Sequence, residues 1–389
     1  MSKGQYFTTN SELQNIVFSL CKNKGKTLEP SAGPGFLVDF FKSKGKLIDV
    51  AIEVDETLKF ITDGITIMNF FDFQSKDLFD TILGNPPYVK YKDIEERFKI
   101  KSTYNSLNLY LYFIEECFYH LNYLGGELVF IIPRDFFLNT RAKSIRNLLW
   151  HNGTITDVID FQEKKLFKDA NPYVIIIRYE KGNFSHLTNY TLGNVTTIKK
   201  ELLKDDFIRF SSLTNNDNDT LDNYFDIKVG LVSGANKIFE SEEFGNIEII
   251  CSDFLKTKKK RKFIFSEEGN YSKEVFDYLK GFKQQLMSRK IKSFNDYNWF
   301  EWGAVRNLKI MKQNGNAIYV NGQTREQKPF FVEKLGYFST LALIPKNKTI
   351  DLSYWVEKLN NSNKEFIEQN FMVGNKYQFS PKNLSKFIV

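Results

Sequence analysis

Cysteine and histidine are scarce in this sequence, with three of each among 389 residues. Cys21, Cys117 and Cys251 are far apart and odd in number, so they suggest neither a disulfide framework nor a CxxC metal site. The histidines show no metal-ligand spacing either. We therefore expect free thiols in a reducing compartment and no metal cofactor.

Long apolar runs are also missing. No stretch of eighteen consecutive apolar residues exists, so the sequence predicts no membrane-spanning helix. The first thirteen residues, MSKGQYFTTNSEL, lack the apolar core of a secretory signal peptide. These absences predict a cytoplasmic protein.

The last third of the chain has few acidic residues relative to its basic ones, so its net charge is positive. Residues 251–389 carry 25 Lys+Arg and 13 Asp+Glu, whereas residues 1–250 carry 29 and 34. A basic segment joined to a mildly acidic one indicates that the basic part faces a polyanion, for which nucleic acid is the obvious candidate. A solvated, lysine-rich surface is the alternative interpretation.

Short apolar segments alternate with segments of helical spacing in the first half. We predict strands at 26–28, 48–54, 65–73, 79–84, 127–133, 154–161 and 173–180. We predict helices at 36–43, 57–64, 107–126 and 141–153. Strands that are apolar on both faces and separated by helices indicate a mostly parallel sheet covered on both sides. The 161–173 connection is too short for a helical crossover, so the last strand should be antiparallel.

This alternation stops after about residue 205. The polar segment at 213–223, LTNNDNDTLDN, is typical of a linker or surface loop, and the sequence beyond it is aromatic, basic and irregular. We therefore predict a Rossmann-like α/β domain over 1–205, with a mostly parallel seven-stranded sheet. A mixed α+β domain should follow over 206–389.

The motif Asn85-Pro86-Pro87-Tyr88 follows the predicted strand 79–84. An exocyclic amine such as adenine N6 is a poor nucleophile because its lone pair is delocalised. Two acceptors, the Asn85 side-chain oxygen and the Pro86 carbonyl, would draw the nitrogen toward a tetrahedral form and aim its lone pair at a methyl group. The two prolines fix φ and remove competing donors, and Tyr88 offers a ring for stacking. A simple strand terminator is the alternative interpretation.

A glycine-rich loop joins the first predicted strand to the first predicted helix. Its sequence is Glu29-Pro30-Ser31-Ala32-Gly33-Pro34-Gly35. Gly33 and Gly35 would let the backbone approach a ligand closely. A phosphate is one possible ligand, but no Lys-Ser/Thr pair follows, which excludes a Walker loop.

Acidic residues end the next two predicted strands. Glu53 suits the two hydroxyls of a ribose. Asp72 could accept from the amino group of an adenine, and Phe73 could cover a face of that ring. A nucleoside without a phosphate requirement fits S-adenosylmethionine better than NAD. Each acid alone could instead be a helix cap or a surface charge.

Further aromatic and basic residues concern nucleic acid. Phe167 lies in a polar loop near the same sheet edge, where it could stack on an extruded base together with Tyr88, or simply anchor its loop. Basic residues of the last third are interleaved with Trp299, Trp302, Tyr319 and Tyr337. The candidate DNA-binding residues are Lys258, Lys259, Lys260, Arg261, Arg306 and Arg325.

The order of these motifs resembles that of the N6-adenine DNA methyltransferases of type II restriction-modification systems, in the gamma-type arrangement with a C-terminal target-recognition domain. The resemblance rests on GQYFTT (4–9), LEPSAGPG (28–35), AIEVDE (51–56), FDF (71–73), FDTILGNPPY (79–88), ELVFIIP (127–133) and LFKDANPYVIIIRY (166–179). FDIKVGLVSGANKIF (225–239) looks like the start of the recognition domain.

The resemblance implies a bacterial, monomeric enzyme that acts on double-stranded DNA with S-adenosylmethionine as methyl donor. A separate cognate restriction endonuclease is a candidate partner. Catalysis would fall to Asn85, Pro86, Pro87 and Tyr88, with Phe167 stacked on the base. Thr8 would close over the donor. The other implied donor contacts are Glu29, Pro30, Ser31, Gly33, Gly35, Glu53, Asp72 and Phe73.

Four other functions share parts of this pattern. Protein-glutamine methyltransferases carry the same Pro-Pro motif but have a helical domain in front rather than a basic domain behind. Ribosomal RNA adenine methylation is a second alternative, and a catalytically silent DNA-binding protein is a third. Cytosine N4 methylation requires the same amine geometry, and Asn at position 85 favours adenine only by resemblance.

Overall fold

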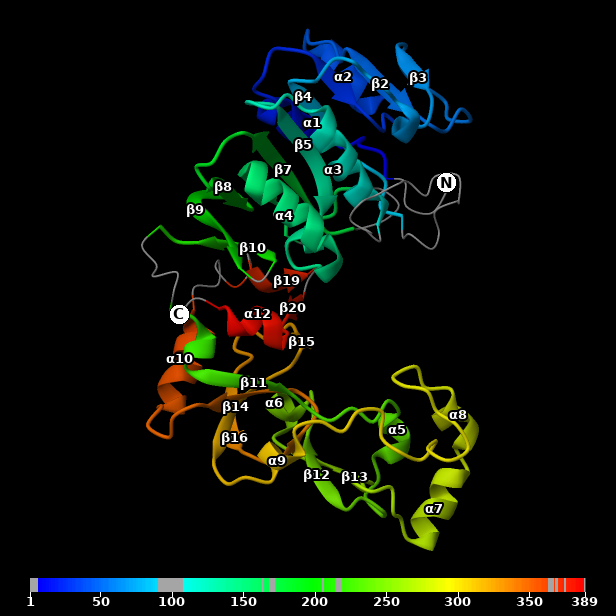
Figure 1. Cartoon of the computed structure of the whole chain (residues 1–389), viewed down its shortest axis with the longest axis vertical. Helices are drawn as coiled ribbons and strands as arrows, with labels where there is room; N and C mark the ends of the chain where they lie inside the picture. Colours follow the sequence, from blue (N-terminus) through cyan, green and yellow to red (C-terminus); the bar gives the residue numbers. More distant parts are fainter. Residues whose placement is uncertain are drawn as a thin grey trace. The chain divides into compact units, whose positions relative to one another are not determined.

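The computed structural model describes residues 6–89, 108–162, 164–167, 172–204, 206–213, 219–362, 367, 370–373, 376–387 and 389. These form two compact units (Figure 1). Unit 1 comprises Met1–Asn215 and Glu365–Asn375, and unit 2 comprises Asn216–Lys364 and Lys376–Val389. Within the described ranges, no helix combines the length and the apolar character that a membrane crossing requires.

Unit 1 is built on a ten-stranded sheet. Its strand order is β10-β9-β8-β6-β7-β5-β4-β1-β2-β3. The strands are β1 (Thr27–Glu29), β2 (Val50–Glu53), β3 (Ile65–Ile67), β4 (Thr81–Gly84), β5 (Glu127–Pro133), β6 (Gly153–Asp160), β7 (Val174–Lys181), β8 (Leu187–Leu192), β9 (Val195–Lys204) and β10 (Phe207–Ser211). A short strand, β19 (Met372–Val373), completes the strands of this unit.

The seven predicted strands are the contiguous part of this sheet from β6 to β3. Strands β3, β2, β1, β4 and β5 run parallel, and β7 is antiparallel to both β5 and β6. The expected α/β methyltransferase fold with an antiparallel last strand is therefore confirmed. The sequence analysis did not predict β8–β10, which extend the sheet beyond β6. Because β10 pairs with β9, unit 1 continues past residue 205 to Asn215.

Helices cover both faces of the sheet. They are α1 (Ser11–Leu20), α2 (Phe36–Ser43), α3 (Leu109–His120) and α4 (Lys143–Asn152), with 3-10 turns η1 (Phe70–Asp72), η4 (Arg134–Phe137) and η5 (Thr140–Ala142). Along β5, Leu128, Phe130 and Ile132 join the core under α3 and α4. Val129 and Ile131 point the other way and join the core under α1 and α2.

The predicted helix at 57–64 is wrong, because this segment forms turns in the structure. The N–H of Ile61 donates to the carbonyl of Pro34 at 3.0 Å instead of to a residue one turn earlier. Gly64 adopts a φ of 87°, which a right-handed helix does not allow. The apolar spacing of residues 57–64 suggested a helix, but a contact with the glycine-rich loop determines the conformation of this segment instead.

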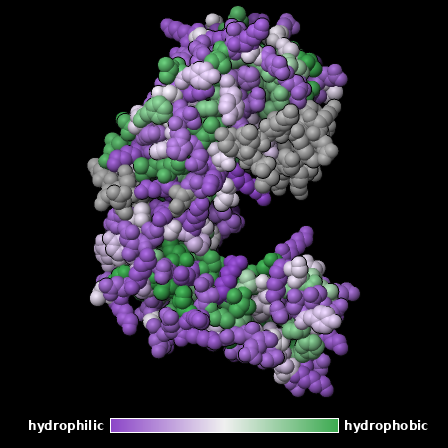
Figure 2. All heavy atoms as spheres, in the orientation of Figure 1, coloured by the Kyte–Doolittle hydropathy of each residue, from purple (hydrophilic) through white to green (hydrophobic). Residues whose placement is uncertain are grey.

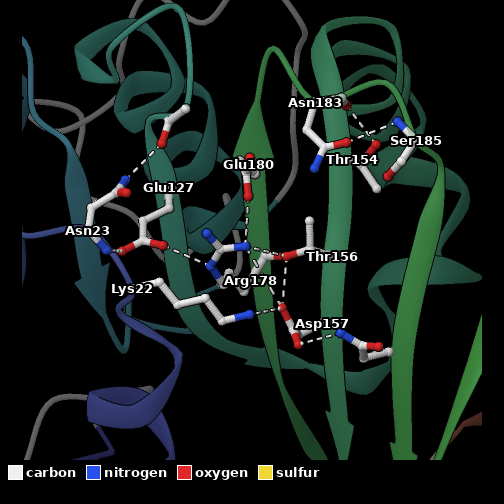
Figure 3. A network of polar contacts seen from close by, with 12 residues as sticks. Lys22, Asn23, Glu127, Thr154, Thr156, Asp157, Arg178, Glu180, Asn183 and Ser185 are labelled. Atoms are coloured by element: carbon white, nitrogen blue, oxygen red, sulfur yellow. Dashed lines mark hydrogen bonds and ion pairs between the residues drawn. The ribbon is translucent and has the colours of Figure 1, made fainter.

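A buried polar network holds β5, β6 and β7 together (Figure 3). Arg178 on β7 donates through Nε to Glu127 at 2.7 Å, and through Nη1 to Thr156 at 2.7 Å and to Glu180 at 2.9 Å. Glu127 also accepts from the backbone of Asn23 at 2.9 Å. Because Glu127 begins β5, this network stabilises the sheet at the amino end of that strand, away from the carboxyl edge where the predicted site residues lie.

Unit 2 contains a four-stranded and a three-stranded sheet. The first, β11-β18-β14-β16, is antiparallel, and the second has the order β13-β12-β17. The strands are β11 (Phe225–Val229), β12 (Ile247–Ile250), β13 (Arg261–Phe263), β14 (Asn316–Val320), β15 (Gln323–Thr324), β16 (Phe331–Lys334), β17 (Tyr337–Phe338), β18 (Leu341–Pro345) and β20 (Lys376–Gln378). Strand β15 pairs with β20.

Short helices connect these strands. They are α5 (Asn236–Phe239), α6 (Phe254–Thr257), α7 (Lys273–Lys280), α8 (Lys283–Met287), α9 (Leu308–Met311), α10 (Leu352–Asn361), α12 (Pro381–Ser385) and the turn η6 (Leu221–Asn223). This mixture confirms the predicted α+β character of the second part. Figure 2 shows hydrophilic residues over most of the visible face, with hydrophobic residues gathered over β11, β14 and β16. Of the predicted linker at 213–223, residues 214–218 lie outside the described ranges.

Candidate active site

The carboxyl ends of adjacent parallel strands bring the two predicted loops together. Strand β1 pairs with β2 on one side and with β4 on the other. Glu29 therefore ends its strand next to Glu53 on β2 and next to Asn85, which follows β4. A Cβ added to Gly84 would lie 3.8 Å from Cγ of Glu29. The glycine-rich loop and the Asn-Pro-Pro-Tyr motif thus share one edge of the sheet.

Hydrogen bonds fix the side-chain amide of Asn85. Its Nδ2 donates to the carbonyl of Tyr6 at 2.6 Å and lies 3.3 Å from Oγ1 of Thr8. Its Oδ1 accepts from the hydroxyl of Tyr88 at 2.6 Å. An amide oxygen has two lone pairs, so Oδ1 can accept one further hydrogen bond. The structure thus provides one acceptor whose direction is set by three neighbours.

Tyr88 contributes a hydroxyl as well as a ring. Its hydroxyl also lies 3.0 Å from the carbonyl of Ile131, and its ring packs edge-on against Tyr110 with centroids 6.1 Å apart. Burial, and then the neighbouring Tyr6, raises the pKa of Tyr88, so the hydroxyl stays protonated and acts as a donor. Pro86 is buried and Pro87 half-buried in the same turn.

Phe167 is buried, with 6% of its surface exposed. It belongs to the core under α1 and α2, where it packs with Leu13, Leu166 and Ile176. It therefore anchors its loop and also reaches the aromatic residues beside Asn85, because its ring centroid lies 5.6 Å from that of Tyr6. The next four residues of this loop, 168–171, lie outside the described ranges.

The glycine-rich loop requires both of its glycines. Gly33 and Gly35 adopt φ values of 56° and 95°, which side chains rarely tolerate. A Cβ at Gly35 would lie 2.6 Å from Cγ2 of Thr62, and a Cβ at Gly33 would lie 3.1 Å from the ring of Phe7. The chain itself thus approaches these glycines closely, from both sides of the loop.

Glu53 holds this loop in place. Its Oε2 accepts from the backbone N–H of Gly33 at 2.7 Å, and its Oε1 accepts from the N–H groups of Val54 and Asp55 at 2.9 Å. Glu53 is therefore a structural anchor of the loop, whatever ligand its remaining lone pairs contact.

Glu29 and Ser31 each have a buried polar atom without a hydrogen-bond partner among the described residues. Oε2 of Glu29 and Oγ of Ser31 are buried and make no hydrogen bond to the described residues. Burial, and then the charge of Glu53, raises the pKa of Glu29 well above its usual value. Unsatisfied buried polar atoms are costly, and their presence in a native site indicates a ligand. A cation with several donors would satisfy both.

Of the other predicted donor contacts, Asp72 and Phe73 lie at η1 and Thr8 lies beside Asn85. Asp72 is exposed, and its carboxylate lies 3.3 Å from Nδ2 of Asn69. The ring of Phe73 packs against Phe70 and His120, at centroid distances of 6.3 and 5.6 Å. Pro30 is buried. Thr8 is also buried and faces Asn85.

Tyr6 is the residue of this site that the sequence analysis missed. It lies within the segment GQYFTT, from which only Thr8 was selected, and its carbonyl and ring both contact the predicted catalytic residues. The aromatic residue two positions before the threonine was the available signal. Gly4 and Gln5 of this segment lie outside the described ranges.

Two of the six predicted DNA-binding residues of unit 2 are ion-paired. Arg261 contacts both Glu240 and Asp253, at 2.9 and 2.6 Å, and Lys260 lies 3.5 Å from Glu333. In contrast, the exposed side chains of Lys258, Lys259, Arg306 and Arg325 form no ion pair with any residue that the structure describes.

The aromatic residues expected among these cations are mostly core residues. Trp299, Trp302 and Tyr319 are at most 3% exposed, so they are not available to stack on a ligand. Tyr337 is half-buried. These aromatic side chains pack in the core of unit 2. The hydrophobic periodicity of the sequence did not distinguish this role from one in ligand binding.

Comparisons with known proteins fit this geometry. Residues 18–167 match the Eco57I restriction-modification methylase family. The chain is 28% identical to the type II methyltransferase M.HindII of Haemophilus influenzae, over 84% of this chain and 76% of that protein. It is 33% identical to the type II methyltransferase M.HincII of Haemophilus influenzae, over 52% of this chain but only 42% of that protein.

Solved structures that match this chain in part include the methyltransferase subunit of a type I restriction-modification system from Streptococcus thermophilus. That subunit is 18% identical, with a TM-score of 0.39, over 49% of this chain and 48% of that one. The DrdV–DNA complex is 12% identical, with a TM-score of 0.45, over 92% of this chain and 52% of that one. The similarity to the Eco57I restriction-modification methylase family thus covers residues 18–167, the part of the chain that contains both the glycine-rich loop and the Asn-Pro-Pro-Tyr motif.

Proposed function

We propose that this chain transfers a methyl group from S-adenosylmethionine to N6 of an adenine extruded from duplex DNA. One observation carries the proposal: the amide of Asn85 is fixed on three sides and keeps a lone pair available beside the glycine-rich loop. An acceptor fixed in advance is the kind that stabilises charge developing on an amine in the transition state.

The residues of the glycine-rich loop fit the methyl donor. The ammonium group of its methionine moiety supplies several N–H donors, which would satisfy Oε2 of Glu29 and Oγ of Ser31. Gly33 and Gly35 would serve by adopting the φ values of 56° and 95° that shape this loop. When bound, S-adenosylmethionine supplies an electrophilic methyl group on a sulfonium.

The acceptor side would work through Asn85 and Pro86. Oδ1 of Asn85 and the carbonyl of Pro86 would each accept from one N–H of the amine, which draws the nitrogen lone pair out of conjugation. The hydroxyl of Tyr88 supports Asn85 from behind at 2.6 Å. No covalent enzyme intermediate is required, because the amine attacks the methyl group directly.

Unit 2 would bind the DNA. It contains most of the basic last third, and Lys258, Lys259, Arg306 and Arg325 are exposed. Similarity to M.HindII and M.HincII, which are named type II methyltransferases, supports a modification role beside a restriction enzyme. Phosphate contacts should make DNA binding fall steeply with salt concentration.

The test is incubation with labelled S-adenosylmethionine and a mixture of duplex DNA, RNA and protein, followed by mass analysis of the nucleosides and amino acids. N6-methyladenine in DNA alone is the expected result. N4-methylcytosine would change the assigned base, and label in RNA or in protein glutamine alone would overturn the DNA assignment. Loss of all label in Asn85→Ala excludes a contaminating enzyme.

A further inference from the structure

The ring of one side chain, Tyr6, contacts both aromatic residues that are proposed to hold the base. The ring of Tyr6 lies 5.5 Å from that of Tyr88, at an interplanar angle of 38°, and 5.6 Å from that of Phe167, at 49°. These distances lie in the usual range for aromatic contacts. Tyr6 therefore makes with both residues the contacts that an extruded base would need.

The backbone of Tyr6 is held independently of its ring. Its carbonyl accepts from Nδ2 of Asn85 at 2.6 Å. Two residues later, the carbonyl of Thr8 accepts from the side chain of Gln14 at 2.9 Å. Between them, the ring of Phe7 rests against Gly33. The ring of Tyr6 can thus rotate about its side-chain bonds while the backbone continues to orient Asn85.

We infer that Tyr6 is a built-in occupant of the base pocket, which an incoming base must displace. A phenol ring is planar, has two π faces and ends in a polar group, so it satisfies the same aromatic surfaces as a nucleobase. The 6% exposure of Phe167 agrees with a pocket that the chain itself fills. The nature of the incoming base rests on the proposed function, whereas the occupied pocket does not.

Displacement has a consequence for selectivity. A base that enters gains contacts with Tyr88 and Phe167, but Tyr6 loses equivalent contacts at the same time. Stacking alone therefore gives little net stabilisation, and capture depends on the hydrogen bonds that Asn85 and Pro86 make to the exocyclic amine. The ring of Tyr6 would discriminate against bases that can stack but cannot make these bonds.

The test compares Tyr6→Ala with the wild type by fluorescence titration of free 2-aminopurine, without DNA. Removal of the ring should strengthen binding of this probe about threefold to tenfold, the range that the loss of a competing aromatic pair accounts for. Tyr6→Phe keeps the ring and should bind the probe as the wild type does. Tyr123→Ala, which removes a tyrosine that is 72% exposed, is the matched control for unit 1.

The outcomes separate this inference from the proposed function. Weaker or unchanged probe binding by Tyr6→Ala, with an unchanged circular dichroism spectrum, would show that Tyr6 is a wall of the pocket and overturn the inference. Stronger binding by this variant would support it even if no variant methylated DNA. If the wild type methylates DNA but Tyr6→Ala does not bind 2-aminopurine more strongly, the proposed function stands and the inference is wrong. A variant that fails to fold is replaced by Tyr6→Leu, which keeps apolar volume but no ring, with the same expectation.

Discussion

Gly33 donates its backbone N–H to Oε2 of Glu53 across 2.7 Å, and this bond ties the glycine-rich loop to the end of β2. The carboxylate is 7% exposed and also accepts two N–H groups from its own strand end. The position of the proposed donor site therefore depends on a residue whose first role is to hold the loop.

Replacement of Glu53 by Ala should weaken binding of S-adenosylmethionine by roughly tenfold or more, because a hydrogen bond to a charged group contributes about 1.5–3 kcal/mol. Isothermal titration calorimetry measures this change. Glu56→Ala, at an exposed position three residues on, should leave the affinity unchanged. Equal affinities for both variants would contradict the anchoring role.

Replacement of Asn85 by Ala should lower kcat by roughly a hundredfold or more and leave the donor affinity nearly unchanged, because the lost acceptor acts mainly in the transition state. Single-turnover methylation and donor titration measure the two quantities separately. Asn147→Ala is a suitable control, since Asn147 lies on α4 and its side-chain amide donates locally, to the carbonyl of Lys143 at 2.9 Å, and to Asp206 at 3.4 Å. A fully active Asn85→Ala enzyme would be incompatible with the proposed mechanism.

Donor binding should strengthen as the pH rises through the raised pKa of Glu29. Burial and the charge of Glu53 favour the neutral carboxyl in the free protein, whereas the donor ammonium requires the carboxylate. Binding should therefore release a proton on the acid side of this pKa. Titrations in buffers of different ionisation enthalpy measure the release, and Glu29→Gln should abolish it. A proton release that survives in Glu29→Gln would point to another group.

Stability should fall as the pH rises from the ordinary range of a carboxyl group to about 8. Burial raises the pKa of Glu201 to about 8, although the N–H of Ile155, which donates to its Oε2 at 2.9 Å, acts in the opposite direction. Across this window the folded protein binds more protons than the unfolded chain, so the free energy of unfolding decreases, by at most about 1.4 kcal/mol per pH unit. Urea unfolding of wild type and Glu201→Gln tests this. The variant should show a flatter profile.

DNA affinity should depend on the lysines that lack an ion pair. Lys258→Ala combined with Lys259→Ala should reduce the slope of log affinity against log salt by about two. The matched variant, Lys256→Ala with Lys262→Ala, removes lysines that lie 3.0 Å from Glu326 and 3.5 Å from Glu242. Its slope should change less. A larger change in the matched variant would relocate the DNA contact.

The sequence was sufficient for the sheet and for the position of the main motifs. Strand β5 follows the predicted range of 127–133 because its five central apolar residues, Leu128 to Ile132, are buried on both faces and leave little choice. Strands β8 to β10 were not predicted because polar residues such as Asn189, Thr196 and Lys199 interrupt their apolar pattern. Sheet extension at an edge depends on pairing rather than on local periodicity.

The sequence predicted which loops of the candidate site meet, but not the contacts between their residues. Motif order located Asn85 and the glycine-rich loop because strand ends fix where loops meet. It could not show that Thr8 faces Asn85, that Arg261 is neutralised by two acids, or that Tyr6 fills the space beside Tyr88. Such contacts join residues far apart in sequence, and only the folded chain determines them.

Unit 1 is a discontinuous unit, since Glu365–Asn375 returns to it after unit 2. Asn370 accepts from the N–H of Phe210 and donates to its carbonyl, both at 3.1 Å and across 160 residues of sequence. The edge strand β10 of unit 1 therefore depends on a segment that follows unit 2 in the sequence. Removal of residues 365–375 would therefore affect unit 1 itself, because the backbone N–H and carbonyl of the buried Phe210 would both lose their partner.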